Sequence, residues 1–210
     1  DEISDNLHEV TMAKKVIRED LPIQIGFFVY QYAKLHMLKF DFDFLDKFVD
    51  RSDYQYVAMD TDSAYIAISG ENLDDLVKPD LRAHYHREKF NWFPRADTPE
   101  NAAYDKRTPG LFKVEWEGEG IVALCSKTYY CWGETDKFSC KGVNKRNNNI
   151  NKELYLKVLK DKHSQSGVNK GFRVKDNSIF TYTQSRAGFT YFYPKRKVLE
   201  DGVSTTYLDL

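Results

Sequence analysis

Two aspartates separated by one residue, Asp60 and Asp62, are the residues whose type and spacing most directly suggest chemistry. They lie between the runs YQYVAMD and SAYIAIS, both of which are typical of strands, so both carboxylates lie at a turn. Mg²⁺ is commonly held by one or two carboxylates together with substrate phosphates, as in two-metal phosphoryl transfer. The pattern indicates a Mg²⁺ site. The alternative is a turn whose acids accept hydrogen bonds from their own backbone.

A lysine and a tyrosine, Lys127 and Tyr129, form a second candidate pair. The surrounding run IVALCSKTYYCW is β-prone, and residues two apart on a strand face the same side. A strand here would present an ammonium and a phenol together. The alternative is a surface lysine beside a core tyrosine.

The charge is divided unevenly along the chain. Residues 1–100 carry 12 Lys and Arg against 20 Asp and Glu, whereas residues 121–198 carry 16 against 5. A basic segment of this kind suggests an anionic partner, and the acidic segment suggests cations. Two solvated faces are the alternative.

The first half of the chain is expected to position the aspartates with one long helix and one hairpin. Asp20 is the expected N-cap and Pro22 lies near the first turn. Apolar residues then recur at helical spacing and predict a mostly buried helix that includes KFDFDF and ends before residues 51–53; they are Ile25, Phe28, Val29, Tyr32, Leu35 and Leu38. The two runs beside the aspartates are expected to be strands buried on both faces. Short helices are expected over 73–77 and 81–90.

The second half is expected to contain two hairpins and one helix. Residues 92–110 hold three prolines and are expected to form a loop. Residues 111–117 should turn at 118–120 and pair with 121–132. An amphipathic helix over 150–161 should bury Ile150, Leu154, Val158 and Leu159. A hairpin over 171–184 should turn at residues 176–177. The fold class is therefore α+β with antiparallel strands, and a basic subdomain begins near residue 140.

The composition restricts the class of protein and the compartment to be expected. The 210 residues contain no run of about 18 apolar residues, so no transmembrane helix and no membrane partner are expected. Three cysteines without C-x-x-C spacing argue against a disulfide framework or zinc site and favour an intracellular compartment. The chain begins with Asp, and we expect sequence upstream of it.

Four stretches of this chain resemble family B DNA polymerases. MDTDSAYIAISG (59–70) closely resembles the D-T-D-S hairpin called motif C, and LPIQIGFFVYQYAK (21–34) resembles the helix beneath it. SKTYYCWG (126–133) resembles the K-x-Y element, and FSCKGVNK (138–145) is similar to the strand leading into the thumb. The likeness extends from about residue 12 to the end. It is greatest to the protein-primed branch, and within it to polymerases encoded by transposons.

The resemblance implies roles for individual residues. Asp62 would be the direct ligand of two Mg²⁺ ions, and Asp60 would support the same site. A primer 3′-hydroxyl would attack the α-phosphate of a deoxynucleoside triphosphate. Lys127 and Tyr129 would hold the primer end. Duplex phosphates would be contacted by basic residues, the candidates being Lys141, Lys145, Arg146, Lys170, Arg173 and Lys195–Lys197.

The resemblance also implies an organisation and partners. Residues 1–139 would be the C-terminal half of an antiparallel palm with packed helices, and residues 140–210 a small basic thumb. The partners would be a DNA primer-template and deoxynucleoside triphosphates, with a terminal priming protein as a further candidate, in the nucleus or at a site of viral or transposon replication. The D-x-x-S-L-Y-P motif and a lysine-bearing fingers helix are not found here. We therefore expect an aspartate outside this chain to complete the metal site, and the chain alone to be inactive. The alternative is a decayed or repurposed fragment that at most binds DNA.

Overall fold

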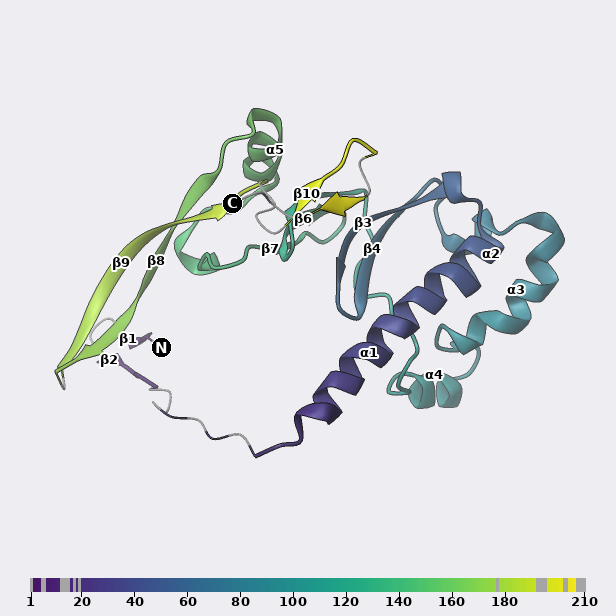
Figure 1. The fold of residues 1–210 in the computed structure, drawn as a ribbon, viewed down its shortest axis with the longest axis horizontal. Helices are drawn as coiled ribbons and strands as arrows, with labels where there is room; N and C mark the ends of the chain where they lie inside the picture. Colours follow the sequence, from purple (N-terminus) through teal and green to yellow (C-terminus); the bar gives the residue numbers. More distant parts are fainter. Residues whose placement is uncertain are drawn as a thin grey trace.

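The computed structural model describes residues 2–4, 7–11, 16, 18, 20–176, 178–191, 196–201 and 204–206. Helices alternate with five small sheets in these ranges, and every described strand pairing is antiparallel. The predicted α+β class with antiparallel strands is confirmed. Figure 1 shows the helical part around α1 to α4 at one end of the long axis and the β8–β9 hairpin at the other.

One continuous helical segment runs from Ile23 to Phe48. α1 (Ile23–Lys39) passes into a π-helical stretch (Phe40–Leu45) and then into α2 (Asp46–Phe48). The prediction that KFDFDF stays helical is confirmed. The N-cap is Pro22 rather than the expected Asp20, and Pro22 makes no side-chain capping bond.

The prediction that this helix is mostly buried is wrong for its first half. All six residues expected in the core are exposed, including Phe28 at 53% and Tyr32 at 67%. Burial begins at Met37 and continues through Phe40 and Phe44. Helical spacing identifies an apolar face but not what covers it, and among the described residues none covers the N-terminal half of α1.

The aspartate hairpin packs on the buried end of this helix. β3 (Tyr54–Asp60) and β4 (Ser63–Ile68) pair as a two-stranded sheet, which confirms the two strands. Their burial on both faces is not borne out, since side chains such as Met59 remain exposed. The two strands pair with no third strand in the described ranges. The first hydrophobic core lies at their base and contains Phe40, Phe44, Leu45, Phe48, Val49, Tyr54, Val77 and Tyr85.

Short helices cover this core, as the sequence predicts over 73–77 and 81–90. They are the 3₁₀ turns Leu73–Leu76, Pro79–Leu81 and Lys89–Asn91 and the helix α3 (Arg82–Glu88). The stretch expected to be a loop contains a helix as well, α4 (Pro99–Asp105). Thr98 caps α4 through its side chain and Pro99 occupies the first turn, where a missing N–H costs nothing. The proline that suggested a loop is thus a helix start.

The expected pairing of 111–117 with 121–132 is wrong. Residues 111–118 have no regular secondary structure, and the long β-prone run is itself a hairpin of β5 (Gly120–Cys125) and β6 (Thr128–Trp132). The turn falls at Ser126 and Lys127, where Lys127 adopts a left-handed φ of 62°. A third strand, β7 (Lys137–Ser139), pairs with β6. The composition of IVALCSKTYYCW marks this turn only weakly, because Ser126 occupies it and neither Gly nor Asn does.

A second core joins this sheet to the C-terminal elements. α5 (Lys152–Asp161) packs on β5 and β6 and buries Tyr155 and Val158, while Leu159, expected inward, is 47% exposed. The cluster combines residues from both sides of position 140: Val122, Leu124, Tyr130, Cys140, Val143, Tyr155, Val158 and Phe189. The domain boundary expected at 139/140 stays a prediction, but packing is continuous across that position.

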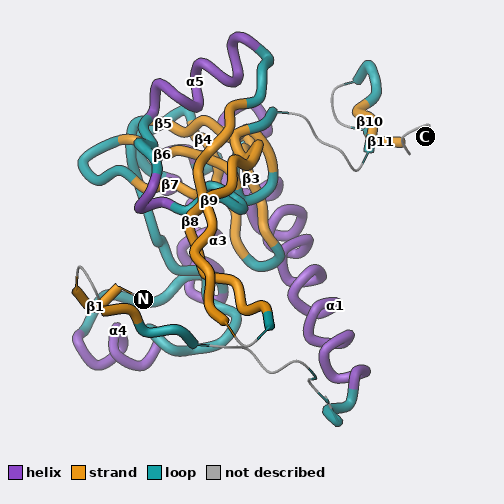
Figure 2. The backbone as a smooth tube through the Cα atoms, turned by 90° about the vertical axis from the view of Figure 1, so that its left-hand side faces the viewer, coloured by secondary structure: helices purple, strands orange, loops and turns teal. Residues whose placement is uncertain are grey.

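A long two-stranded ribbon extends from the second core. β8 (Gln165–Lys175) and β9 (Ser178–Phe189) pair along their whole length, from Gln165↔Phe189 to Lys175↔Ser178. Asp176 lies in the expected turn with φ 50°, while Asn177 lies outside the described residues. In the perpendicular view of Figure 2 the ribbon runs from the β5–β7 sheet across the front of the molecule.

Two minor hairpins complete the described chain, β1 (Glu2–Ser4) with β2 (Leu7–His8) and β10 (Lys197–Val198) with β11 (Thr205–Thr206). Over the described residues, no helix combines the length and the apolar character that crossing a membrane requires.

Candidate functional site

The D-T-D-S sequence forms the tip of the β3–β4 hairpin. Asp60 ends β3 and pairs with Ser63, so Thr61 and Asp62 make a two-residue turn. Thr61 has a left-handed φ of 47°, and the Asp62 amide donates to the Asp60 carbonyl at 2.6 Å. The Ser63 hydroxyl donates to the same carbonyl at 3.1 Å. The turn is therefore closed by backbone and hydroxyl groups, and this leaves both carboxylates available for other partners.

The two carboxylates have different surroundings. The Lys127 ammonium lies 3.1 Å from Asp60 Oδ2, and the Thr61 hydroxyl lies 3.4 Å from Asp60 Oδ1. Asp62 is exposed at the outer end of the turn. In the described part of the chain no hydrogen bond or ion pair engages its carboxylate.

Lys127 comes from the corresponding turn of the second hairpin, β5–β6. The sequence interpretation placed Lys127 on a strand with Tyr129, and this is wrong, because Lys127 is a turn residue and only Tyr129 belongs to β6. The Lys127 backbone is fixed from outside the turn, since its carbonyl accepts the Ser139 hydroxyl at 2.9 Å. The two hairpin tips thus meet through one acid and one cation.

A second contact joins the two hairpins below their tips. The Tyr65 and Tyr129 hydroxyls are hydrogen-bonded to each other at 3.1 Å, and the two rings lie 4.8 Å apart between centroids. Burial, reinforced by the Tyr65 hydrogen bond, raises the pKa of Tyr129 well above its ordinary value. Tyr129 is therefore a neutral hydrogen-bonding group at physiological pH.

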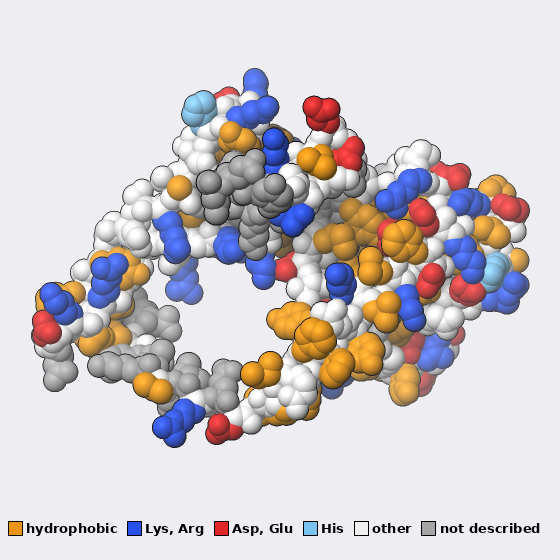
Figure 3. Space-filling view, in the orientation of Figure 1, with side chains coloured by type: hydrophobic (Ala, Val, Ile, Leu, Met, Phe, Trp, Pro, Cys, Tyr) orange, Lys and Arg blue, Asp and Glu red, His pale blue; other side chains and the backbone are white. Residues whose placement is uncertain are grey.

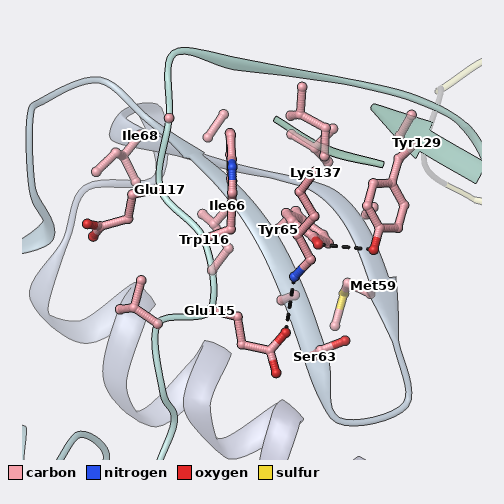
Figure 4. A pocket seen from close by; sticks show the side chains of 18 of the residues that line it. Met59, Ser63, Tyr65, Ile66, Ile68, Glu115, Trp116, Glu117, Tyr129 and Lys137 are labelled. Carbon is pink, nitrogen blue, oxygen red and sulfur yellow. Dashed lines mark hydrogen bonds and ion pairs between the residues drawn. The ribbon is translucent and has the colours of Figure 1, made fainter. Parts of the chain in front are cut away.

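Lys137 and Glu115 extend this contact. Figure 4 shows the Lys137 ammonium bonded to the Glu115 carboxylate beside Tyr65, with an N–O distance of 3.2 Å. The ammonium also lies 5.6 Å from the Tyr65 ring centroid. Partial burial opposes the charge of Lys137, but its hydrogen bonds with Tyr65 and Glu115 outweigh burial and raise its pKa. None of these three residues belongs to the predicted site.

An open cleft of about 1560 Å³ lies against both hairpins. It is lined by the tip residues Asp60 and Asp62, by Lys127 and Tyr129, and on its far side by the irregular segment 111–119. Figure 4 shows Glu115, Trp116 and Glu117 of that segment across from the apolar side chains of β4. The cleft therefore has two aspartates at its mouth, an apolar wall and three lining lysines, Lys113, Lys127 and Lys137.

The donor set at the tip fits a hard cation in part. The exposed and unpaired carboxylate of Asp62 is an oxygen ligand of the kind that Mg²⁺ takes. Asp60 already holds a cationic partner. Within the described ranges, no group of three or more His, Cys, Asp or Glu side chains is arranged to hold a metal ion. At the tip itself, the carboxylate without a described partner is that of Asp62.

The basic residues predicted to contact DNA do not all have free side chains. Lys145 donates to the Phe138 carbonyl at 2.7 Å and lies 4.7 Å from the Phe138 ring centroid. Lys141 and Arg146 are exposed in the turns that follow β7. Figure 3 shows Lys and Arg side chains gathered along the upper margin of the open space between α1 and the ribbon.

The ribbon separates its own basic residues onto two faces. The register pairs Arg173 with Phe180 and Arg186 with Gly167, and this puts both arginines on one face with Lys175. Lys170 pairs with Thr183 and faces the other side. The Arg173 guanidinium stacks over Tyr182 at 4.6 Å. Arg186 and Lys175 were missed by the sequence interpretation, since only the strand register brings them beside Arg173.

The last predicted cluster is described only in part. Lys195 lies outside the described residues. Arg196 donates to the side chain and the carbonyl of Thr205, at 2.7 and 2.9 Å, and so stabilises the β10–β11 hairpin. Lys197 is exposed on β10.

Comparison with protein-family models, curated proteins and solved structures found no match to this chain. A functional assignment therefore depends on the motif resemblance and on the geometry of the two hairpin tips.

Proposed function

We propose that this chain is part of a DNA-directed DNA polymerase of family B and contributes one side of its nucleotidyl-transfer site. The observation that carries the proposal is the 3.1 Å contact between Asp60 of the D-T-D-S tip and Lys127 of the K-x-Y turn. Asp60 and Lys127, which belong to these two motifs, are 67 positions apart in the sequence. A chance likeness of two short motifs does not require that they meet in space.

The proposed reaction extends a primer by one nucleotide. The primer 3′-oxygen attacks the α-phosphorus of a deoxynucleoside triphosphate, a new P–O bond forms, and the bond to the β-phosphate oxygen breaks. Pyrophosphate leaves with the bonding electrons, and the hydroxyl proton passes to solvent. When bound, Mg²⁺ activates the 3′-hydroxyl and neutralises charge on the leaving pyrophosphate.

The residues of this chain bind and orient the reactants. Asp62 supplies a carboxylate ligand from the rigid tip. Lys127 pairs with a phosphate near the primer end, and Tyr129, held neutral, packs beside the terminal sugar. The rest of the chemistry is positioning and charge compensation. Because one vacant carboxylate does not make a two-metal site, we expect the chain to need an acidic residue from outside it.

The test is a primer-extension assay on the full-length polymerase that carries Asp62→Asn. Loss of the ligand charge should lower the incorporation rate by at least about 100-fold, the scale seen when one transition-state electrostatic group is removed. Asp80→Asn, which removes an exposed acid in a 3₁₀ turn far from the tip, is the matched control and should keep full activity. Equal rates for the two variants would refute the role of Asp62.

A second candidate function is duplex binding without catalysis. The observation that favours it is the row of Arg173, Lys175 and Arg186 on one face of the ribbon. A chain that only binds DNA would show log K falling linearly with log salt, with a slope near −0.9 for each phosphate neutralised. Substituting all three residues with Gln should reduce that slope by about two to three units. If the ribbon does not contact DNA, the slope of log K against log salt should be the same in this variant as in the unsubstituted chain.

A further inference from the structure

The Tyr129 hydroxyl is held from the opposite hairpin rather than by its own sheet. Its hydrogen bond to the Tyr65 hydroxyl, at 3.1 Å, is the one that its hydroxyl makes within the described ranges. Tyr65 belongs to β4, whereas Tyr129 belongs to β6. The place of the Tyr129 hydroxyl therefore depends on whatever fixes the Tyr65 ring.

Lys137 lies on the same face of the sheet as Tyr129. In the β6–β7 register Tyr129 pairs with Ser139 and Cys131 pairs with Lys137, so Lys137 is the diagonal neighbour of Tyr129. Tyr65 approaches these two side chains from the other hairpin. Its ring centroid is 4.8 Å from that of Tyr129 and 5.6 Å from the Lys137 ammonium. The Tyr65 ring thus has a tyrosine of one strand and a lysine of the next as neighbours.

The Lys137 ammonium is itself held in place. Glu115 Oε2 lies 3.2 Å from it, and Figure 4 shows this ion pair beside the Tyr65 ring. An ammonium has three hydrogen-bond donors, so it can serve a carboxylate and a phenol at once. Partial burial opposes its charge, but hydrogen bonding with Tyr65 and Glu115 outweighs burial and raises the pKa of Lys137. Lys137 therefore stays charged and joins Glu115 to the β3–β4 hairpin where Tyr65 meets Tyr129.

The segment that carries Glu115 is fixed on both sides of it. The Phe112 amide donates to the Trp92 carbonyl at 2.7 Å, and the Trp116 indole donates to the Thr135 carbonyl at 2.7 Å. Thr135 lies in the loop before β7, so the second anchor keeps the segment beside the strand that carries Lys137. Between these anchors Glu115 has a defined place, although its side chain is 77% exposed.

We propose that Lys137 is a positioning residue for Tyr129. Held by Glu115, it keeps the Tyr65 ring against Tyr129 and so fixes the tyrosine side chain that lines the cleft. The proposal deepens the proposed function and rests on it for the ligand, since Tyr129 is placed there beside the sugar at the primer end. Lys137 does not contact the DNA itself, because its ammonium is engaged by Glu115 and Tyr65.

The first experiment measures the Tyr65–Tyr129 contact on the chain as it exists, without DNA. Trace O-acetylation with N-acetylimidazole, followed by mass spectrometry, gives the reactivity of the Tyr129 hydroxyl relative to that of Tyr104, which is 73% exposed. Lys137→Met keeps an unbranched side chain and removes the ammonium. It should raise Tyr129 labelling by about two- to five-fold, the range for one partly exposed ion pair, and Glu115→Gln should change it in the same direction.

Two further variants show whether the effect belongs to the Lys137 cation. Lys137→Arg keeps a cation and hydrogen-bond donors and should label like the unsubstituted chain. Lys113→Met removes another cleft-lining lysine, one that is exposed and forms no ion pair in the described part of the chain, and should label like it as well.

Unchanged Tyr129 labelling in Lys137→Met would overturn the proposal. An equal increase in Lys113→Met or in Lys137→Arg would overturn it too, since the effect would then not come from the Lys137 cation. None of these results depends on polymerase activity or DNA binding. They are therefore distinguishable from failure of the proposed function, which would appear as a full-length protein that extends no primer.

The second experiment measures the consequence for DNA in the full-length polymerase. Lys137→Met should slow primer extension by about two- to five-fold. The slope of log K for duplex binding against log salt should stay the same, because the Lys137 ammonium neutralises no phosphate. In the background of Tyr129→Phe, Lys137→Met should have no further effect, since the hydroxyl that it positions is gone.

A salt slope reduced by about 0.9 in Lys137→Met would contradict the positioning role, because it would show Lys137 in direct contact with a phosphate. Full additivity of Lys137→Met and Tyr129→Phe would contradict it as well, because two residues that act through one contact are not independent.

Discussion

Two acids two residues apart have different chemistry in this protein because a turn separates them. Asp60 is the last residue of β3 and faces the neighbouring hairpin, whereas Asp62 lies beyond the left-handed Thr61 and points to solvent. The backbone geometry of the turn thus gives the two acids of one short motif different surroundings. Of the two carboxylates, that of Asp62 has no partner in the described part of the chain.

At the residue scale, Tyr65→Phe tests the contact between the hairpins. The substitution keeps the ring packed against Tyr129 and removes its hydroxyl partner. We expect the free energy of unfolding to fall by about 0.5–1.5 kcal/mol, the net value of one hydrogen bond, and the pKa of Tyr129 to move down towards its ordinary value. Urea denaturation and a tyrosinate absorbance titration measure the two effects. A pKa of Tyr129 that does not change would contradict this account.

Residue types and spacing identified Asp60, Asp62, Lys127 and Tyr129 but not their partners. Tyr65 and Lys137 entered no motif, because their roles come from contacts between hairpins far apart in sequence. Burial was misjudged for Leu159 for a related reason, since one helix turn away Tyr155 fills the core. Pairwise contacts across elements are not encoded in local spacing.

At the scale of elements, the turns carry the site. Both Thr61 and Lys127 adopt left-handed φ values without being Gly or Asn, and they lie in the turns of the two hairpins that meet. The two strands beside the aspartates could be predicted, because their sequences are rich in β-branched and aromatic residues. The turn at Lys127 could not be predicted in this way, because Ser126 signals a turn only weakly and Lys127 does not signal one.

The α4 segment offers an element-scale prediction. Arg95 donates to Asp105 through its backbone amide and two guanidinium nitrogens, at 2.7–2.9 Å, and these bonds lower the pKa of Asp105 to about 2. A carboxyl with a lowered folded-state pKa stabilises the fold above its unfolded pKa, and this contribution disappears as the pH falls towards 2. We expect Asp105→Asn to weaken the fold at pH 7 and to flatten its pH dependence between about 4 and 2.

Hydrogen exchange of residues 92–110 as a function of pH measures this effect. Protection factors, which correct for the intrinsic pH dependence of exchange, should fall on acidification in the unsubstituted chain and be low already at pH 7 in Asp105→Asn. Asp97→Asn is the matched control, since Asp97 lies in the same segment and its carboxylate accepts hydrogen bonds from the Asn101 side chain rather than from the Arg95 guanidinium. An identical response of the two variants would show that the Arg95–Asp105 pair does not hold the segment.

At the scale of the whole molecule, the N-terminal half of α1 leaves a broad apolar surface open. Its exposed large side chains are Ile23, Ile25, Phe27, Phe28, Val29, Tyr30, Tyr32, Leu35 and Leu38. A helix that is apolar on all sides is typical of an element buried in a larger assembly. Sequence periodicity predicted the helix and could not predict this exposure.

We therefore expect the isolated chain to self-associate. Sedimentation velocity should show an average mass that rises with concentration, and Phe28→Glu with Tyr32→Glu should suppress the rise by placing charge in the apolar surface. Tyr104→Glu, which changes a single exposed aromatic on α4, should have no effect. A chain that stays monomeric at all concentrations would argue against an open apolar surface on α1.

The central claim, a divalent-cation site at Asp62 facing the Lys127 turn, is tested most directly by paramagnetic broadening of backbone amide signals with Mn²⁺. The account predicts that substoichiometric Mn²⁺ broadens residues 60–63 first and the turn at 126–127 next, and that Asp62→Asn abolishes both effects. Broadening centred on the acidic segment at Glu115–Glu119, or a pattern unchanged by Asp62→Asn, would contradict it.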